Sequence, residues 1–430
     1  MALPTNALQQ VQTYQESGLA FLQNLNCFIN LANTKFKDFD KLEANLGSDV
    51  TFDLPPRYTT APTLVASFQP SAQRAQTLIC GQSANTAYAF SAQQFIFNVR
   101  DYMDKFGKSA TMELSTQVEI DIAKNANSSV RNELTGNLVT DSGPFRFYGD
   151  GTTAINSYTQ LADMIARFKN FGSVKQGIKV ILPDTKVPAI VGTGLNQFAI
   201  NRNNDTAMSW EVGSFGTPPV EYYQSNLLPI HYAGNVGNEA QTLTVVSTTV
   251  DASGAVTAIT FSGASTSDAG AIKSGDLLQF KDVSGQPIMR FLTFVGHAVS
   301  DQPVQFRAIA DSASNGSGNV TVSLTPPLQA TSGDANQNIN NAIVAGMQVT
   351  ALPDHRCGLI IGGNSLFLAM PALPDQSPFI TANKVDPDTG VSMRMYYGTL
   401  FGQNQQGFVH DVLWGSTLVP EYCQRIAFPV

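Results

Sequence analysis

The chain has 430 residues, longer than one typical domain, so two or three folding units are expected. Charged residues make up only 13% of it, about half the usual share, and the formal net charge is −8. The chain is acidic and has no run of Lys or Arg. A protein that recognises nucleic acid normally carries a basic stripe, so the composition argues against that class.

The neutral polar residues Asn, Gln, Ser and Thr take the place of the missing charges. Such a surface suits extensive protein–protein contact, because burying these groups costs less than burying ions. A secreted or surface β-protein would have the same composition, so both interpretations stay open at this point. The four cysteines are scattered singly, which predicts reduced, mostly buried thiols and fits a reducing cytoplasm; they are Cys27, Cys80, Cys357 and Cys423.

The first residues, MALPTNALQQVQTYQESG, have neither a basic nor an apolar region of the kind that opens a signal peptide. No apolar run approaches the roughly 20 residues that a membrane span needs. We therefore expect neither secretion nor membrane insertion, and a chain from which no long propeptide has been removed.

Two stretches near the N-terminus are expected to have little core of their own. The pattern of residues 1–36 predicts an arm with a broken amphipathic helix, and such a helix needs a surface to lie on. The alternative is a frayed terminus. Residues 49–90 predict an extended loop with edge strands, because four prolines between 55 and 70 cannot donate to a sheet ladder. A second strand is expected over 72–82, and an isolated hairpin of this kind is marginal in water.

The main helical signal lies in residues 91–129. Apolar residues recur there every four positions and form one stripe, at Phe106, Ala110, Leu114, Val118, Ile122 and Ala126. The early part of this segment carries acidic residues, which the helix dipole favours near an N-terminus: Asp101, Asp104 and Glu113. Several β-branched residues lower its intrinsic helix propensity, so the stripe is expected to pack on a sheet.

An α/β unit follows the long helix. Residues 155–172 predict a second helix, capped by Asn156 or Ser157 and closed by Gly172, with Leu161, Ile165 and Phe168 on one face. The segment GIKVILPD at 177–184 predicts a buried strand. This order implies an α/β subdomain that reaches about residue 235.

The pattern of residues 237–350 predicts a separate all-β module. Short strands are expected at TLTVVSTTV, AVTAITFSG, GDLLQF, VQFRAIADS and NVTVSLTPPL. Gly-rich and Ser-rich turns separate them at intervals that suit a small barrel or sandwich.

The closing part of the chain returns to broad apolar strands. GLIIGGNSLFLAMPALP at 358–374 predicts a strand pair interrupted at Gly362–Asn364, and KVDPDTG at 384–390 predicts a turn. HDVLWGSTLVP alternates poorly, so both faces of its strand are expected to be covered.

No catalytic or metal-binding pattern stands out. The four histidines, His231, His297, His355 and His410, are too far apart for a local two-histidine metal motif. GTG at 192–194 and GDG at 149–151 lack the spacing of a phosphate loop, and DPDTG lacks the later ligands of a calcium loop. We therefore expect no catalytic residues, cofactor or metal, and a structural protein rather than an enzyme.

The order of these segments resembles the HK97-type major capsid protein of tailed bacteriophages. The resemblance covers arm, extended E-loop TFDLPPRYTTAPTLVASFQP, long spine helix and α/β unit, and closes with DVLWGSTLVPEYCQRI, similar to that family's last peripheral strands. The segments IKSGDLLQF, PVQFRAIAD, GNVTVSLTPPL and NINNAIVAG are similar to the inserted β-barrel of the short-tailed Salmonella temperate phage lineage.

The resemblance implies an α+β fold with an inserted all-β domain. The expected parts are an arm at 1–36, an E-loop at 49–90, a peripheral domain with the spine helix at 37–48, 91–154 and 375–430, an axial domain at 155–236 and 351–374, and the inserted domain at 237–350. In that family the insertion steadies the axial domain, aids folding and touches neighbours. No motif here assigns a covalent Lys–Asn crosslink, and a chain starting at Met1 argues against trimming by a maturation protease.

The resemblance further implies a major capsid protein that self-assembles in the host cytoplasm into the icosahedral head of a virion. Hexamers and pentamers would enclose double-stranded DNA without sequence-specific binding, aided by a separate scaffolding protein and a portal, with no membrane partner. The arm around Tyr14–Phe21 is a candidate scaffold contact. The expected subunit contacts are Tyr14, Leu19, Phe21, Arg57, Tyr58, Phe68 and Arg74. The alternatives are an adhesin-like surface protein and a tail or tube component.

Overall fold

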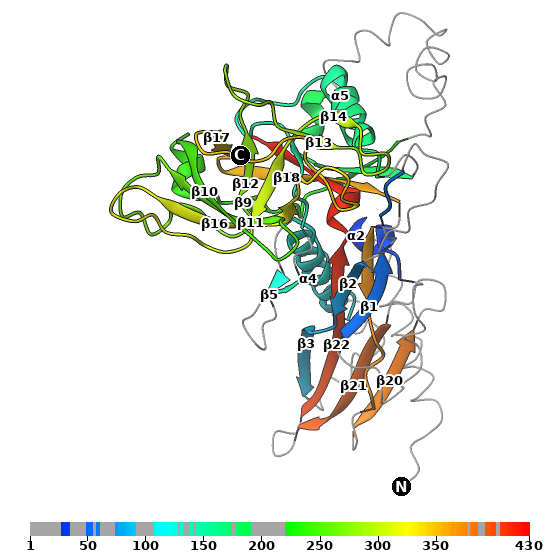
Figure 1. Cartoon of the computed structure of the whole chain (residues 1–430). Helices are drawn as coiled ribbons and strands as arrows, with labels where there is room; N and C mark the ends of the chain where they lie inside the picture. Colours follow the sequence, from blue (N-terminus) through cyan, green and yellow to red (C-terminus); the bar gives the residue numbers. More distant parts are fainter. Residues whose placement is uncertain are drawn as a thin grey trace, which may run out of the picture.

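The computed structural model of the chain describes residues 27–34, 49–54, 57–60, 74–91, 107–127, 130–131, 138–140, 143–173, 177–190, 220–363, 365–375, 379–385, 392–400 and 405–430. These residues form a mixed α and β structure in which strands predominate. Its main parts are a five-stranded sheet, a six-stranded sheet and a closed barrel (Figure 1). No described helix has the length and apolar character needed to cross a membrane.

The five-stranded sheet is antiparallel and extends away from the barrel as a narrow layer (Figure 1). Its strands are β19 (Leu366–Ala369), β22 (Gln405–Leu418), β21 (Ser392–Leu400), β20 (Ile380–Val385) and β3 (Gln82–Ser91). The long strand β22 is its axis, because β3 and β21 pair with its first part and β19 with its end. From Trp414 onward β22 is buried on both faces, as its irregular pattern predicts.

The long helix α4 (Lys108–Asn127) packs against β3 and β22. Its predicted stripe is buried at every described position, from Ala110 to Ala126, whereas Phe106 lies outside the described residues. Of the three acidic residues expected in its early part, Glu113 lies within the described helix, and Asp101 and Asp104 lie outside the described residues. Packing on a sheet therefore supports this helix, as its weak propensity predicts.

The six-stranded sheet carries helix α5 (Tyr158–Asn170) on one face. Its strands are β6 (Phe147–Tyr148), β23 (Cys423–Phe428), β18 (His355–Gly362), β7 (Ile178–Pro183), β8 (Glu221–Ser225) and β9 (Ile230–His231). Leu161, Met164 and Phe168 of α5 pack on this face, while Leu359 and Ile361 on the other face join the core of α4. The predicted buried strand is thus β7, in the sheet interior.

Helix α5 begins with a reciprocal capping box. The Ser157 hydroxyl accepts from the Gln160 N–H at 3.2 Å, and the Gln160 side chain accepts from the Ser157 N–H at 3.2 Å. Replacing Ser157 by alanine should lower the stability of this helix by about 1 kcal/mol, because the Gln160 N–H loses its acceptor. Urea denaturation followed by circular dichroism measures the loss, with Ser317→Ala at an exposed turn as the control. Equal midpoints for the two variants would contradict the role of the cap.

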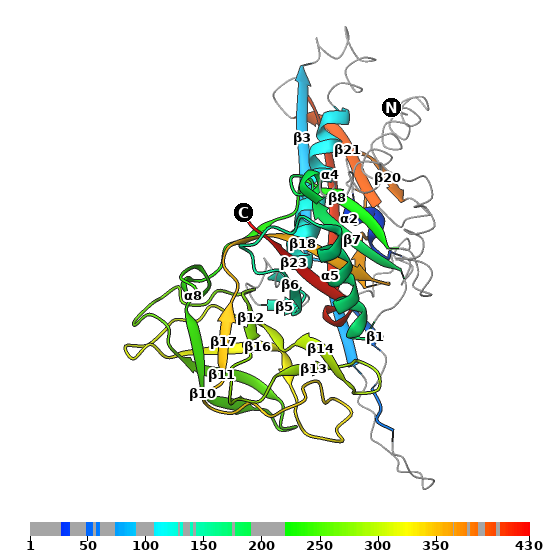
Figure 2. The same ribbon diagram turned by 90° about the horizontal axis from the view of Figure 1, so that it is seen from above.

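The barrel closes in the order β10-β11-β16-β15-β12-β17 and stands apart from the five-stranded sheet in both views (Figures 1 and 2). Its strands are β10 (Thr242–Val250), β11 (Val256–Ser262), β16 (Val320–Leu328), β15 (Gln305–Ala308), β12 (Leu277–Phe280) and β17 (Gln348–Ala351). Of the two predicted architectures, the structure has the barrel. A hairpin of β13 (Arg290–Leu292) and β14 (Val299–Pro303), which was not predicted, lies beside it.

Several predicted boundaries differ from the structure. Residues 82–91, predicted as part of the extended loop, form β3, because all ten residues pair with β22. The strands over 358–374 are not a pair, since β18 and β19 lie in different sheets. Strand β23, assigned with 375–430 to the peripheral unit, lies between β6 and β18 in the six-stranded sheet, as its complete burial requires.

Short elements complete the described structure. They are α2 (Cys27–Leu31), α8 (Asn235–Asn238), the 3₁₀ turn η3 (Pro420–Tyr422), the ribbon of β1 (Asp49–Leu54) with β2 (Arg74–Ile79), and the pair β4 (Val130–Arg131) with β5 (Leu138–Thr140). All four cysteines are free thiols, and Cys357 and Cys423 are buried.

Candidate functional site

The barrel joins the rest of the chain through two adjacent strands. The chain leaves the six-stranded sheet after β9 and returns to it at β18, and these strands pair antiparallel, with His231 opposite His355. Entry and exit therefore lie side by side. A module attached in this way can be placed on the sheet without interrupting its hydrogen-bond ladder.

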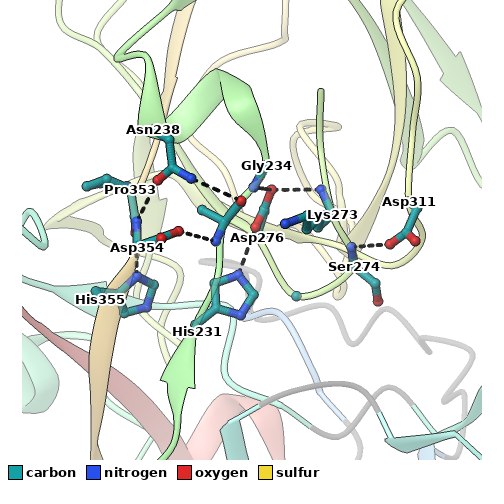
Figure 3. Close-up of polar contacts among 12 residues, drawn as sticks. His231, Gly234, Asn238, Lys273, Ser274, Asp276, Asp311, Pro353, Asp354 and His355 are labelled. Atoms are coloured by element: carbon teal, nitrogen blue, oxygen red, sulfur yellow. Dashed lines mark hydrogen bonds and ion pairs between the residues drawn. The ribbon is translucent and has the colours of Figure 1, made fainter. Parts of the chain in front are cut away.

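Asp276, in the loop before β12, ties the barrel to the entering strand (Figure 3). Its carboxylate accepts from His231 Nε2 at 2.7 Å, from the Gly234 N–H at 3.0 Å and from the Lys273 N–H at 2.8 Å. The side chain is almost fully buried. A buried carboxylate is stable only when its oxygens are hydrogen-bonded, and this one has three donors.

The exit strand is tied to the entry segment by a second set of bonds (Figure 3). Asp354 accepts from the Ala233 N–H at 2.7 Å, and the Asp354 N–H donates to Asn238 Oδ1 at 2.9 Å. In α8, between Ala233 and Asp354, the backbone at Gly237 lies so close to Leu352 that only glycine fits there. A Cβ on Gly237 would overlap the carbonyl group of Leu352, whose carbon would be 2.9 Å away.

Arg425 connects three parts of the molecule at this junction. From β23 its guanidinium donates to the carbonyl of Asn127 at the end of α4 and to the carbonyl of Gly275 in the barrel loop at 3.3 Å. It also faces His355 Nε2 at 3.5 Å. The side chain is completely buried, and burial lowers its pKa. An arginine near a helix C-terminus satisfies carbonyls that have no partner within the helix.

The two histidines of the junction are held in neutral form. His355 Nδ1 lies 2.7 Å from the Pro353 carbonyl, which can only accept, so Nδ1 carries the proton and Nε2 is left as an acceptor for Arg425. Burial, with the charge of Arg425 adding to it, lowers the pKa of His355 to about 3. Burial also lowers the pKa of His231, although its bond to Asp276 opposes this.

A glutamine cluster forms a further contact between barrel and sheet. The Gln305 amide accepts from the Phe147 N–H at 2.8 Å and donates to the Phe147 carbonyl at 3.1 Å, which extends the hydrogen bonding of β6 into the barrel. Gln305 also bonds Gln279 and Gln302, each at 2.8 Å. Two adjoining clefts of about 430 Å³ each open between α5 and the barrel, and Arg167 and Gln279 line both.

The predicted subunit contacts are only partly within the described residues. Tyr14, Leu19, Phe21 and Phe68 lie outside them, and the backbone of Arg74 begins β2. Arg57 contacts its own chain, because its guanidinium lies 4.4 Å from the centre of the Phe294 ring and donates to the Phe294 carbonyl at 3.2 Å. Tyr58 is 58% exposed. The predicted subunit contacts therefore stay a prediction.

The last part of the predicted arm is docked in the core of the same chain. The Glu119 carboxylate of α4 accepts from the N–H groups of Cys27, Phe28 and Ile29, at 2.8, 2.7 and 3.3 Å. Phe28 is completely buried. The expectation that residues 1–36 have little core of their own is therefore wrong for 27–34, because a single buried carboxylate holds the first N–H groups of α2.

The base of the β1–β2 ribbon is also held by the same chain. Leu78 is completely buried beside Ala369, and Gln76 Nε2 donates to Thr417 Oγ1 at 3.0 Å. The ribbon backbone passes directly over Gly415, where a Cβ would be 2.7 Å from the Ile79 carbonyl carbon. A side chain on β22 at this point would push the ribbon away.

Sequence reasoning treated His231 and His355 as lone histidines and did not single out Asp276, Glu119 or Arg425. One signal was present, since Arg425 is the one charged residue of the closing strand CQRIAF. A charge in such a strand requires buried partners. In the described residues no group of three or more His, Cys, Asp or Glu side chains is placed to hold a metal ion.

Solved structures similar to this chain include three from bacteriophages. The capsid of Ralstonia phage GP4 is 10% identical, with 94% of this chain and 88% of that chain covered and a TM-score of 0.41. The capsid structure of the cyanophage P-SCSP1u is 11% identical, with 92% and 88% covered and a TM-score of 0.39. A structure from Mycobacterium phage Che8 is 9% identical, with 93% and 90% covered and a TM-score of 0.39.

TM-scores below 0.5 do not by themselves establish a common fold, so no role is assigned from these similarities. No family model matches the chain, and no curated protein matches it by sequence.

Proposed function

We propose that this chain is the major capsid protein of a tailed bacteriophage, which self-assembles into the icosahedral head that encloses double-stranded DNA. The observation that carries the proposal is the order of the elements along the chain. A ribbon, a long helix on a narrow antiparallel sheet, an α/β unit, a closed barrel and closing strands follow one another as the HK97-type resemblance implies. The barrel between β9 and β18 supports the finer resemblance to the Salmonella phage lineage.

The form of the narrow sheet supports an assembly role. Helix α4 covers one face of β3, while the residues that alternate toward its other face are exposed and small or neutral: Ser83, Asn85, Ala87 and Ala89. A flat surface without charges can be buried by a neighbour at little desolvation cost. In a closed symmetric lattice many such contacts act together, so each can be weak.

The remaining parts of the proposal follow from the resemblance. Hexamers and pentamers form the shell, a separate scaffolding protein guides assembly in the host cytoplasm, and a portal occupies one vertex. The subunit has a structural role, which is to contain the DNA, and it is not a catalyst. Its net negative charge suits a shell that does not bind DNA tightly. Candidate contacts between subunits remain the arm, with Tyr14, Leu19, Phe21, and the extended segment with Tyr58, Phe68 and Arg74.

The test is to express the full chain with and without a candidate scaffolding protein and to examine the product by sedimentation and negative-stain electron microscopy. Closed polyhedral shells are the expected result. Rings or open tubes would instead indicate a tail component. Small soluble monomers under every condition would overturn the proposal.

Gly415→Ala tests whether the ribbon matters for assembly. Its Cβ would meet the backbone of Ile79 and Cys80, so the ribbon base must shift. The yield of closed shells should fall at least tenfold while the chain stays soluble, because a displaced ribbon cannot meet its neighbour. Gly316→Ala is the control, since no atom lies within 4 Å of its added Cβ. Wild-type yield from Gly415→Ala would show that the ribbon position is not needed.

A further inference from the structure

We propose that the junction of His231, Asp276, His355 and Arg425 is an acid-sensitive latch, which holds the barrel on the six-stranded sheet at neutral pH and opens when His355 takes up a proton. This inference is independent of the proposed shell function, because it concerns contacts within a single chain. It rests on where the chain crosses between barrel and sheet, and on the hydrogen-bond roles that the crossing residues have.

Both connections between barrel and sheet pass through this cluster. His231 belongs to the entering strand and His355 to the returning strand, and their rings are 5.3 Å apart. Asp276 comes from the barrel and Arg425 from the last strand of the sheet, so each element contributes one group. Movement of the barrel away from the sheet at this point must therefore break these contacts.

The geometry requires His355 to be neutral. Its Nδ1–H donates to the Pro353 carbonyl, so Nε2 presents a lone pair to Arg425 Nη1 at 3.5 Å. A proton on Nε2 would place two donors and two positive charges face to face. In a buried site this repulsion has no solvent to screen it. Protonation and the closed junction therefore exclude each other.

The surrounding charges do not offset a proton on His355. The charged groups that face the two rings are Asp276 from the barrel loop, Asp354 from the exit segment and Arg425 from β23. Arg307 of β15 is near enough to Arg425 for their charges to repel, and it adds to the positive charge there. Asp276 already has three donors, and Asp354 accepts from the Ala233 N–H. A proton on His355 would thus add a positive charge beside Arg425, with no carboxylate of the described residues bonded to the ring.

The direction of the pH effect follows from the lowered histidine pKa values. A group whose pKa is lower in the closed state stabilises that state above its ordinary pKa, and the contribution is lost as the pH falls. The pKa of His355 is about 3 in the closed junction against an ordinary value of 6.5. Between pH 7 and pH 5 the population of the open junction should therefore rise roughly 20-fold if opening exposes His355.

Hydrogen exchange of the unassembled full chain, read by mass spectrometry, tests this at a series of pH values. Rates are corrected for the intrinsic pH dependence of amide exchange, and peptides spanning 231–238 and 352–358 are compared with strand β16 in the barrel wall. We expect protection at the junction to fall at least 20-fold between pH 7 and pH 5 while β16 keeps its protection. A constant ratio between junction and β16 would overturn the latch.

Two variants identify the titrating groups. In His355→Gln the amide oxygen can still accept from Arg425, and in His231→Gln the amide N–H can still donate to Asp276, but neither side chain takes up a proton. His355→Gln should reduce the pH dependence at the junction to threefold or less, whereas His231→Gln should retain the response of His355. Wild-type pH dependence in His355→Gln would also overturn the proposal, and if that variant fails to fold, the pH series of the wild type decides.

His410→Gln is the matched control. His410 is a buried histidine in the five-stranded sheet, bonded to the Tyr88 hydroxyl at 3.1 Å, and burial lowers its pKa to about 4. It is far from the junction in the fold, so this variant should change the acid response of β3 and β22 while the junction behaves as in the wild type. A loss of the junction response in His410→Gln would mean that acid acts on the whole chain and not on the latch.

Discussion

Replacing Glu119 by alanine should detach residues 27–34 from the core and reduce the free energy of unfolding of this region by about 3 kcal/mol. The carboxylate is the shared acceptor of three consecutive N–H groups, those of Cys27, Phe28 and Ile29. Alanine leaves these buried donors without an acceptor and opens a cavity under α2. Hydrogen exchange of peptides over 27–34 measures the release directly.

Two further variants make the result specific. Glu113→Ala removes an exposed carboxylate from the same helix and should leave the protection of 27–34 unchanged. Glu119→Gln keeps one acceptor oxygen for Cys27 and Phe28, so its loss should be smaller than that of alanine. If the exchange protection of residues 27–34 were the same in Glu119→Ala as in Glu113→Ala, the Glu119 carboxylate would not be what holds this segment.

The pH dependence of this anchor has a defined sign. Burial raises the pKa of Glu119, against the three backbone donors that lower it. A carboxyl whose pKa is raised by folding stabilises the fold at low pH, and this contribution is lost as the pH rises through the raised value. The stability of Glu119→Gln relative to the wild type should therefore increase with rising pH over that range.

Gly237→Ala should have an effect of similar size at the barrel junction. The new Cβ would overlap the Leu352 carbonyl group, and backbone on both sides prevents an easy shift. Overpacking of this kind costs about 3 kcal/mol where the neighbours cannot move. We expect a lower thermal midpoint and faster thermolysin cleavage near α8, because the entry and exit strands can no longer close on each other.

Gly270→Ala is the matched control for this substitution. It lies next to α8, and its added Cβ would meet its nearest neighbour, Asn235 Nδ2, at 3.6 Å, an ordinary contact distance. Its thermal midpoint and cleavage rate should match those of the wild type. If Gly237→Ala behaved like Gly270→Ala, the close approach of α8 to Leu352 would not be what holds the junction.

Much of the local structure follows from the order of residues along the chain. The stripe from Ala110 to Ala126 predicts the helix that α4 forms, and Ser157 with Gly172 marks the ends of α5. The strands of the barrel follow from short apolar runs between glycine turns, and β10 has the predicted bounds 242–250. These signals are local, because helix and strand periodicity and turn chemistry involve residues close together in sequence.

Only the tertiary structure decided which strands pair and which polar groups meet. Neighbouring strands β18 and β19 separate into different sheets, and β23 returns to the sheet that contains β6 and β7. Asp276, His355 and Arg425 come together from segments far apart in sequence, and Glu119 meets Cys27 across 92 positions. A single sequence carries no local sign of such partners, because the interaction exists only after distant segments are packed and water is excluded from between them.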